Sequence, residues 1–207
     1  ETGTRFTCKD VVLELTQIGK ECHHGCEIFQ KMGECIMPTN GVFAKVLHGG
    51  KISVGDEFHV QYRAAVITLS DTASKGERED ASGVAVEEIV GKEGYEVVFK
   101  KIIPDDGYTL TALLCELSDE DKADLILTTG GTGFSKRDNT PEATMRAVER
   151  ETPGISEAMR YYSLQITPRA MLSRGVSGIR KEALIVNLPG SPKAVRECLE
   201  YAIGALT

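Results

Sequence analysis

Four stretches of the sequence place hydroxyl groups, carboxylates and glycines in a way that suits the binding of an anionic ligand. They are Ser70-Asp71, Pro104-Asp105-Asp106, residues 128–133 (TTGGTG) and residues 187–191 (NLPGS). Residues without Cβ let backbone N–H groups approach phosphate oxygens closely, and threonine hydroxyls add donors. The glycine-rich stretch matches neither the P-loop nor the G-x-G-x-x-G fingerprint. Taken alone, it fits a phosphate loop and a tight turn equally well.

Asp138 is the carboxylate whose position suggests chemistry most clearly. It follows Gly133 by five residues and comes just before Thr140, where a helix is expected to begin. A carboxylate there can simply stabilise the helix N-terminus, by about 0.3–1 kcal/mol. It can also bind Mg²⁺, which proteins commonly hold through one or two carboxylates together with substrate phosphates. Asp105 ends a neighbouring expected strand, and two such aspartates facing one ion favour the Mg²⁺ hypothesis.

The distribution of histidine and cysteine divides the chain into two parts with different chemistry. Residues before 63 hold every histidine and most of the cysteines, which are His23, His24, His48, His59, Cys8, Cys22, Cys26 and Cys35. Residues 63–207 therefore cannot build a Ser/His or Cys/His relay or a histidine-ligated zinc site. The basic side chains there that could neutralise a phosphate are Lys136, Arg137, Arg174, Arg180 and Lys181, although such residues are more often simply solvated.

From Arg63 onward, apolar runs typical of strands alternate with helical patterns. Strands are expected at 64–69, 97–103, 124–129 and 183–188, and a helix at 81–93. Further helices are expected to begin at hydroxyl N-caps, which are Thr109, Thr140 and Ser191. Continuous apolar strands alternating with helices are typical of a parallel sheet covered on both faces. We therefore predict a three-layer α/β domain with the polar loops at the carboxyl ends of its strands, where open α/β sheets bind ligands.

Residues 1–62 follow a β pattern. Apolar residues alternate with period two at 11–18, 42–48 and 51–60, and Gly49-Gly50 is expected to join the last two segments as a hairpin. About 60 residues of strand would bury little core alone. We interpret this segment as the later part of a β-barrel, or as a segment that leans on the second part. The predicted domains are therefore residues 1–62 and 63–207.

Composition excludes several classes of protein. The 207 residues carry 24 basic and 31 acidic side chains, and the formal net charge of −7 argues against nucleic-acid binding. The hydrophobic content of 41% is ample for a folded core and excludes disorder. No apolar run approaches the roughly 18 residues of a membrane span, and residues 1–10 lack the apolar core of a secretory signal. A cytoplasmic location is expected.

Several of these motifs together resemble the molybdopterin adenylyltransferase family. The resemblance rests on residues 127–142 (LTTGGTGFSKRDNTPE), 170–174 (AMLSR), 178–180 (GIR) and 187–192 (NLPGSP). It extends from about Arg63 to the end of the sequence, in the order in which the family has these motifs. The combination is far more specific than the glycine-rich stretch alone.

The resemblance implies a trimeric α/β domain that transfers AMP from MgATP to the terminal phosphate of molybdopterin, in molybdenum cofactor biosynthesis. Carried over by position, it implies that Asp105 and Asp138 are the functional carboxylates and that Ser173 is a further active-site residue. The ligand cleft that it implies is lined by Ser70, Asp71, Thr129, Gly130, Gly131, Thr132, Gly133, Asn187, Pro189 and Gly190. The expected partners are the two substrates, further copies in a homotrimer, and other proteins of cofactor biosynthesis.

Residues 14–60 resemble the later half of a MOSC domain, a β-barrel module that handles sulfurated molybdenum cofactor. The resemblance rests on residues 16–26 (TQIGKECHHGC) and 35–38 (CIMP), and the earlier strands of that barrel have no counterpart in it. MOSC relatives direct a cysteine toward molybdenum, which implies Cys22, with Cys26 next. A zinc site is the alternative, although C-x-x-x-C is not a standard zinc spacing; its ligands would be Cys22, Cys26, Cys35, His23 and His24. A disulfide is less expected in a reducing compartment.

Two other functions compete with catalysis. The same loops could hold the pterin in a non-catalytic molybdopterin-binding or carrier protein, in which no nucleotide turns over. A structural scaffold that organises partners through a trimer is the second alternative. The sequence leaves open whether molybdenum or tungsten is the final metal.

Overall fold

The computed structural model describes residues 2–20, 27–35, 37–38 and 40–206. The chain divides into two compact units, Glu1–Gln61 and Tyr62–Thr207. This division falls within two residues of the point where the sequence pattern changes from β alone to alternating strands and helices. The glycine-rich stretch and the other polar stretches that follow the expected strands all belong to the second unit.

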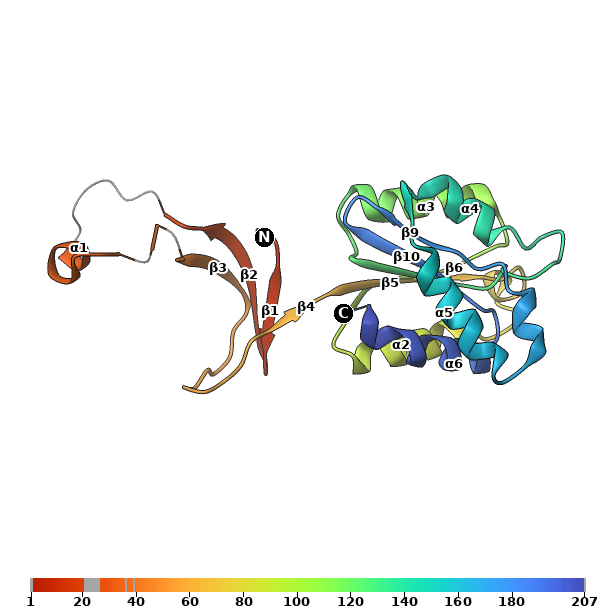
Figure 1. The fold of residues 1–207 in the computed structure, drawn as a ribbon, viewed down its shortest axis with the longest axis horizontal. Helices are drawn as coiled ribbons and strands as arrows, with labels where there is room; N and C mark the ends of the chain where they lie inside the picture. Colours follow the sequence, from red (N-terminus) through yellow and green to blue (C-terminus); the bar gives the residue numbers. More distant parts are fainter. Residues whose placement is uncertain (1, 21–26, 36, 39, 207) are drawn as a thin grey trace. The chain divides into compact units, whose positions relative to one another are not determined.

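The first unit is a four-stranded antiparallel sheet with strand order β3-β2-β1-β4 (Figure 1). Its elements are β1 (Arg5–Cys8), β2 (Val11–Ile18), α1 (Glu27–Met32), β3 (Val42–His48) and β4 (His59–Gln61). Phe6 lies opposite both Leu13 and Val60, so apolar side chains share one face of the sheet. Arg5 lies opposite Glu14 on the other face and forms an ion pair with it at 3.6 Å. The small antiparallel sheet expected from the alternating pattern is therefore present.

The expected hairpin at Gly49-Gly50 is wrong. β3 pairs with β2 and β4 pairs with β1, and the segment between β3 and β4 is irregular. At Gly50 the backbone passes so close to Val11 that an added Cβ would lie 2.9 Å from its Cγ2 atom. The Asp56 carboxylate accepts hydrogen bonds from the Ser53 N–H at 2.8 Å and from Lys9 Nζ at 2.5 Å. These contacts, several of them distant in sequence, override the alternating pattern.

The second unit is built on a six-stranded sheet with strand order β6-β5-β7-β10-β9-β8. Its strands are β5 (Arg63–Leu69), β6 (Glu96–Ile103), β7 (Leu125–Thr129), β8 (Arg150–Glu151), β9 (Ser177–Arg180) and β10 (Ala183–Leu188). Strands β6, β5, β7 and β10 are parallel neighbours, whereas β9 is antiparallel to both β10 and β8. The four parallel strands consequently end at one edge of the sheet, where their following loops meet.

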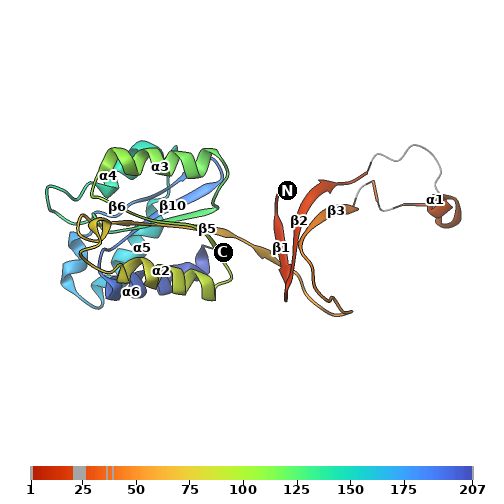
Figure 2. The same cartoon turned by 180° about the vertical axis from the view of Figure 1, so that it is seen from behind.

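Helices cover both faces of this sheet, as Figures 1 and 2 show. One face packs against α2 (Ala81–Lys92), α5 (Pro153–Leu164) and α6 (Pro192–Ala202), and the other against α3 (Gly107–Asp119) and α4 (Thr140–Ala147). Short 3₁₀ turns occupy Ala73–Lys75, Pro168–Leu172 and Ile203–Ala205. In β5, Ala64 and Val66 face the first core while Ala65 and Ile67 face the second, and all four are fully buried. The predicted three-layer α/β fold is confirmed.

The helix starts only partly match the expected hydroxyl caps. Ser191 caps α6 as predicted, because its side chain accepts a hydrogen bond from the Ala194 N–H at 3.2 Å. Thr109 is not a cap: Asp106 caps α3 and accepts from the Thr109 N–H at 2.9 Å. Thr140 is not a cap either, because it is the first residue of α4. In the described part of the chain, no helix is long and apolar enough to cross a membrane.

Candidate active site

A cavity of about 220 Å³ lies at the carboxyl edge of the parallel strands. Six of the residues that the sequence singled out line it together, although they come from four different loops. They are Ser70, Asp105, Gly130, Gly131, Asp138 and Gly190. We call this space the glycine-loop cavity. The parallel sheet brings these residues together because each loop follows the carboxyl end of a neighbouring strand.

The backbone of the glycine-rich loop requires glycine at two positions. Gly130 and Gly131 have φ angles of +100° and +64°, which side chains with Cβ rarely adopt. A Cβ on Gly130 would lie 2.3 Å from the Leu69 carbonyl oxygen, and one on Gly131 would lie 2.4 Å from Thr140 Oγ1. The Thr140 hydroxyl in turn donates a hydrogen bond to the Gly130 carbonyl at 2.9 Å. Thr140 therefore fixes this loop rather than capping a helix.

Asp105, which lines the cavity, is linked to Asp71, and Asp71 is linked to a basic residue. The Asp71 N–H donates to Asp105 Oδ2 and the Asp105 N–H donates to Asp71 Oδ1, both at 3.2 Å. Arg137 holds the Asp71 carboxylate with two nitrogens, each 2.7 Å from a carboxylate oxygen. Arg137, which the sequence offered as a phosphate ligand, is thus paired with a carboxylate.

These contacts shift the two carboxyl groups in opposite directions. Burial raises the pKa of Asp105, and the negative charges of Asp71 and Asp138 add to this effect against the Asp71 N–H and Arg137. For Asp71, burial also favours the neutral form, but the Asp105 N–H and the Arg137 guanidinium outweigh it and lower the pKa. Asp71 therefore ionises at a lower pH than an ordinary aspartate, and Asp105 ionises at a higher pH.

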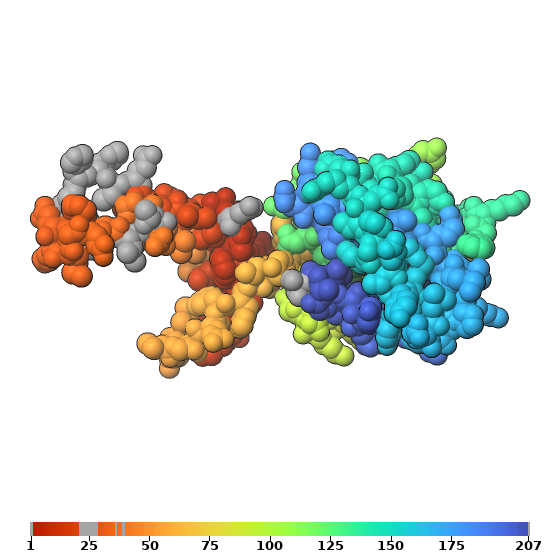
Figure 3. Space-filling model, in the orientation of Figure 1, coloured from red at the N-terminus to blue at the C-terminus, as the bar shows by residue number. Residues whose placement is uncertain are grey.

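Asp138 belongs to the loop between β7 and α4, which projects from the surface of the second unit (Figure 3). Its Oδ2 atom accepts a hydrogen bond from the Ser135 N–H at 2.9 Å, and its own N–H donates to the Ser135 carbonyl at 3.0 Å. A Cβ on Gly133 would lie 2.9 Å from the same Oδ2 atom. The N-cap of α4 is Asn139, so Asp138 is not a helix cap.

Asp105 and Asp138 stay candidate ligands for a metal ion that arrives with its own oxygen ligands. Both line the glycine-loop cavity. Among the described residues, no group of three or more His, Cys, Asp or Glu side chains is arranged to hold a metal ion. Two carboxylates suit Mg²⁺ that is bound mainly by substrate phosphates, because Mg²⁺ typically keeps waters and phosphates as its other ligands.

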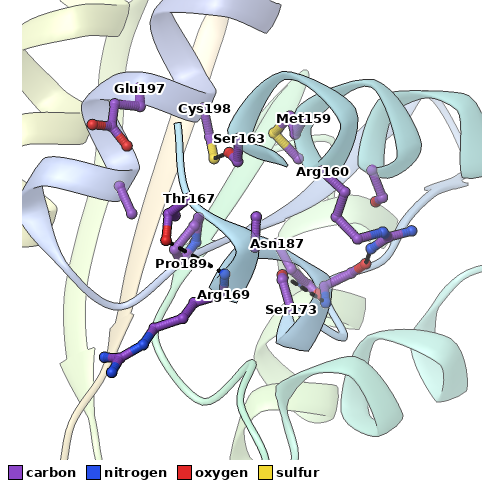
Figure 4. A pocket seen from close by; sticks show the side chains of 14 residues that line it. Met159, Arg160, Ser163, Thr167, Arg169, Ser173, Asn187, Pro189, Glu197 and Cys198 are labelled. Atoms are coloured by element: carbon purple, nitrogen blue, oxygen red, sulfur yellow. Dashed lines mark hydrogen bonds between the residues drawn. The ribbon is translucent and has the colours of Figure 1, made fainter. Parts of the chain in front are cut away.

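A second cavity, of about 210 Å³, takes in three further residues from the sequence analysis. Ser173, Asn187 and Pro189 line it together with α5 and α6, and Figure 4 shows this arrangement. We call it the Ser173 cavity. Cys198 lines it too and lies 3.3 Å from Ser163 Oγ; burial raises the pKa of its thiol. The loop from β10 to α6 contributes residues to both cavities.

Two of the predicted ligand-cleft residues, Asn187 and Thr129, use their side chains to support the structure around the cavities. The buried Asn187 side chain donates to the hydroxyls of Thr128 and Thr144 at 2.9 Å each and accepts from the Val176 N–H at 3.2 Å. The buried Thr129 hydroxyl donates to the Pro189 carbonyl at 2.6 Å. These bonds hold β7, β10 and α4 together beneath the two cavities.

Most of the basic candidates already have acidic partners. Arg180 forms a two-nitrogen pair with Asp119 at 2.9 and 2.6 Å, and Lys181 lies 3.6 Å from Glu149. Arg174 is bound to the glycine-rich loop and to Glu142. Lys136 is exposed.

A further group of polar residues, which the sequence did not single out, also lines the glycine-loop cavity. Asp80 and Ser82 line the cavity with Thr68. Asp80 caps α2 by accepting from the Gly83 N–H at 2.8 Å, and its other oxygen accepts from the Thr68 hydroxyl at 2.8 Å. Asp80 comes just before the helix expected at 81–93, and an acidic residue in that position was the signal in the sequence for a helix cap.

The cofactor-contacting cysteine proposed for the first unit lies outside the described residues. Cys22 and Cys26 belong to residues 21–26, as do both histidines of the alternative zinc site. Cys8 and Cys35 are free thiols. The zinc and molybdenum hypotheses for this segment therefore stay predictions.

The second unit is a three-layer α/β domain with a glycine-rich loop and two adjoining cavities at the carboxyl ends of its parallel strands. These features define a class of protein domain that binds ligands in a crevice at the strand ends. A protein family described as "Probable molybdopterin binding domain" matches this chain over residues 65–207. The chain belongs to this family.

Individual relatives agree with this membership. The chain is 43% identical over 143 residues to a molybdopterin adenylyltransferase of Helicobacter pylori, covering 68% of this chain and 81% of that protein. The solved structure of the molybdopterin biosynthesis enzyme MoaB from Thermus thermophilus is 44% identical with a TM-score of 0.67, covering 70% of this chain and 91% of that one. The tungsten cofactor synthesizing protein MoaB from Pyrococcus furiosus is 35% identical with a TM-score of 0.64, covering 70% and 92%.

Proposed function

We propose that this protein is a molybdopterin adenylyltransferase, which transfers AMP from MgATP to the terminal phosphate of molybdopterin and releases pyrophosphate. The single observation that carries the proposal is the convergence of the glycine-rich loop, Asp105 and Asp138 on one cavity. The names of the relatives at 43–45% identity support the same reaction.

The reaction needs positioning and charge stabilisation more than a strong base. An oxygen of the molybdopterin phosphate attacks the α-phosphorus of ATP, a new P–O–P linkage forms, and the bond between the α- and β-phosphates breaks so that pyrophosphate leaves with the bonding electrons. The attacking phosphate is already anionic at neutral pH. This explains how residues 63–207 can dispense with histidine. Backbone N–H groups of the glycine-rich loop would orient the phosphates and stabilise their charge.

Asp105 and Asp138 would hold Mg²⁺, which neutralises the charge that develops on the phosphate oxygens. Ser70, Gly130 and Gly131 line the same cavity. Arg137 is placed to neutralise Asp71, which keeps a surplus of negative charge away from an anionic substrate. One group of residues would thus bind the phosphates, and the two aspartates would bind the cation that accompanies them.

Both cavities would contribute to a reaction with two large substrates. Each is near 210–220 Å³, below the roughly 300 Å³ at which ligand pockets usually begin. They share the loop from β10 to α6, so ligands in the two spaces would lie next to each other. Ser173, Asn187 and Pro189 line one cavity, and Asp105 and Asp138 line the other. We infer that the predicted ligand-cleft residues serve both substrates.

We also propose a homotrimer that works with other proteins of cofactor biosynthesis in the cytoplasm. The second unit leaves large apolar side chains exposed, among them Tyr108 at 83%, Tyr161 at 67% and Met171 at 65%. An interface between copies would cover apolar side chains of this kind. Sedimentation of the full chain would give the number of copies.

The test of the proposed reaction follows the α-phosphate. ATP labelled at the α-phosphorus is incubated with the full chain, Mg²⁺ and molybdopterin, and the pterin product is isolated. The proposal predicts label in the pterin at one AMP per molecule. Tight pterin binding without label transfer would instead identify a carrier, and absence of ligand binding in a stable oligomer would identify a scaffold. Parallel assays of metal insertion with molybdate and tungstate would tell which metal the product receives.

A further inference from the structure

Arg174 contacts the glycine-rich loop through its backbone N–H and through two of its side-chain nitrogens. It lies between the 3₁₀ turn Pro168–Leu172 and β9. Its backbone N–H donates to the Thr132 carbonyl at 3.0 Å. Its Nε donates to the Gly133 carbonyl at 2.8 Å and its Nη2 to the Asp138 carbonyl at 2.5 Å. The third nitrogen, Nη1, pairs with Glu142.

The two side-chain contacts close the loop from both ends. Within the loop between β7 and α4, Gly133 and Asp138 flank residues 134–137, so one guanidinium group bridges the base of this segment. The guanidinium is planar and its donors have fixed directions, so it constrains the separation of the two carbonyl groups. The Asp138 carboxylate also depends on this spacing, because its Oδ2 atom sits against both Gly133 and the Ser135 N–H.

We propose that Arg174 is a positioning residue that fixes the base of this loop and thereby holds the Asp138 carboxylate at the edge of the glycine-loop cavity. This inference rests on the proposed function, in which Asp138 binds the metal of the nucleotide. Arg174 need not touch substrate, because its donors are directed at the loop carbonyls and at Glu142. The neighbouring Ser173 lines the other cavity, so the same short segment serves both spaces.

The ion pair with Glu142 provides a matched control. The side chains of Arg174 and Glu142 are 32% and 49% exposed, and ion pairs at such exposure typically contribute about 0–1 kcal/mol. Glu142→Gln removes the pair's charge and leaves the two loop contacts in place. Arg174→Lys keeps the charge but has no planar fork, and Arg174→Ala removes both. The three variants separate charge from geometry.

The experiment uses the full chain with Mn²⁺ as a probe that electron paramagnetic resonance detects, in the presence of ATP and without molybdopterin. We expect Arg174→Ala and Arg174→Lys to weaken Mn²⁺ binding by about 10- to 100-fold, the usual range when a residue behind a metal ligand is lost. Glu142→Gln should bind Mn²⁺ as the wild type does. Amide hydrogen exchange of residues 133–138 should accelerate in both Arg174 variants alone. Millimolar guanidinium should restore part of the Mn²⁺ affinity of Arg174→Ala.

Each result decides the inference. Wild-type-like Mn²⁺ binding and exchange in the Arg174 variants would overturn it, and so would equal losses in Glu142→Gln. If Arg174→Ala does not fold, as judged by its unfolding transition, Arg174→Lys decides by the same two measurements. A wild-type chain that binds Mn²⁺ and ATP but releases no pyrophosphate on adding molybdopterin would refute the proposed function, while the metal and exchange data still judge the role of Arg174.

Discussion

Asp71 and Asp105 exchange a pair of hydrogen bonds in which the backbone N–H of each residue donates to the carboxylate of the other at 3.2 Å. β5 and β6 are neighbouring strands, and the pair of hydrogen bonds joins the loop that follows β5 to the loop that follows β6. It fixes Asp105 at the cavity while Arg137 neutralises Asp71. The carboxyl group with the raised pKa is therefore the one that faces the glycine-loop cavity.

Replacing either cavity aspartate should impair turnover without unfolding the protein. We expect Asp105→Asn and Asp138→Asn each to lower kcat by on the order of 10²-fold or more, the range for losing a major electrostatic contact. The Mg²⁺ concentration needed for half-maximal rate should rise in both variants. Asp106→Asn is the matched control, because Asn is also a good N-cap and Asp106 caps α3. Unchanged kinetics in both cavity variants would remove these carboxylates from the metal site.

The raised pKa of Asp105 predicts the acid side of the pH profile. Metal binding needs the ionised carboxylate, so kcat/KM should fall as the pH drops through the pKa of Asp105, which burial raises from its ordinary value. Asp71→Asn removes a negative neighbour and releases Arg137 from its carboxylate partner. Loss of the Asp71 charge lowers the pKa of Asp105, so this limb of the profile should move to lower pH. An acid limb that stays in place in Asp71→Asn would contradict this assignment, and Asp106→Asn again serves as the control.

The close approach of Gly131 to Thr140 predicts a coupled pair of mutations. Gly131→Ala forces a Cβ into a left-handed backbone position, 2.4 Å from the Thr140 hydroxyl oxygen. We expect it to destabilise the protein by about 1–3 kcal/mol. In a Thr140→Ala background the hydroxyl is gone, so the same change should cost less. Urea unfolding of the four proteins gives the coupling energy, and additive effects would show that the contact is not the cause.

The division into two units predicts that the first is dispensable for catalysis. Deleting residues 1–60 should leave AMP transfer largely intact, because the second unit has its own sheet, helices and cores and is of ordinary domain size. Cys22→Ser in the intact chain should also spare AMP transfer, and any effect should appear only in retention of molybdenum, since a thiolate is a soft ligand and a hydroxyl is not. Loss of AMP transfer in a folded truncated protein would mean that the first unit completes the active site.

The sequence predicted the four parallel strands and the three layers of the second unit because these patterns are local, but it did not predict β8, β9 or α5. Apolar runs such as 64–69 and 183–188 lie between polar loops, and these loops must meet once the strands are parallel. Ser191 was predictable as a cap because Pro192 follows it. Thr140 has the same local pattern, yet its hydroxyl bonds to Gly130, a partner that only the folded loop brings near.

The partners of individual side chains were less predictable because they come from distant parts of the chain. Asn187 was expected among the ligand contacts, and the structure directs its side chain to Thr128, Thr144 and the Val176 N–H. The fork of Arg174 reaches carbonyl groups more than 30 residues away. Periodicity and motif spacing identify which residues are polar at a strand end, but tertiary contacts decide which of them bind the loop and which face the cavity.

The most direct test of the proposed function is pyrophosphate release by the full chain with MgATP, measured with and without molybdopterin. We predict release that requires both substrates, reaches one pyrophosphate per adenylylated pterin, and nearly disappears in Asp138→Asn. Molybdopterin that binds tightly while no pyrophosphate forms with the wild-type chain would contradict the proposed reaction and identify a carrier.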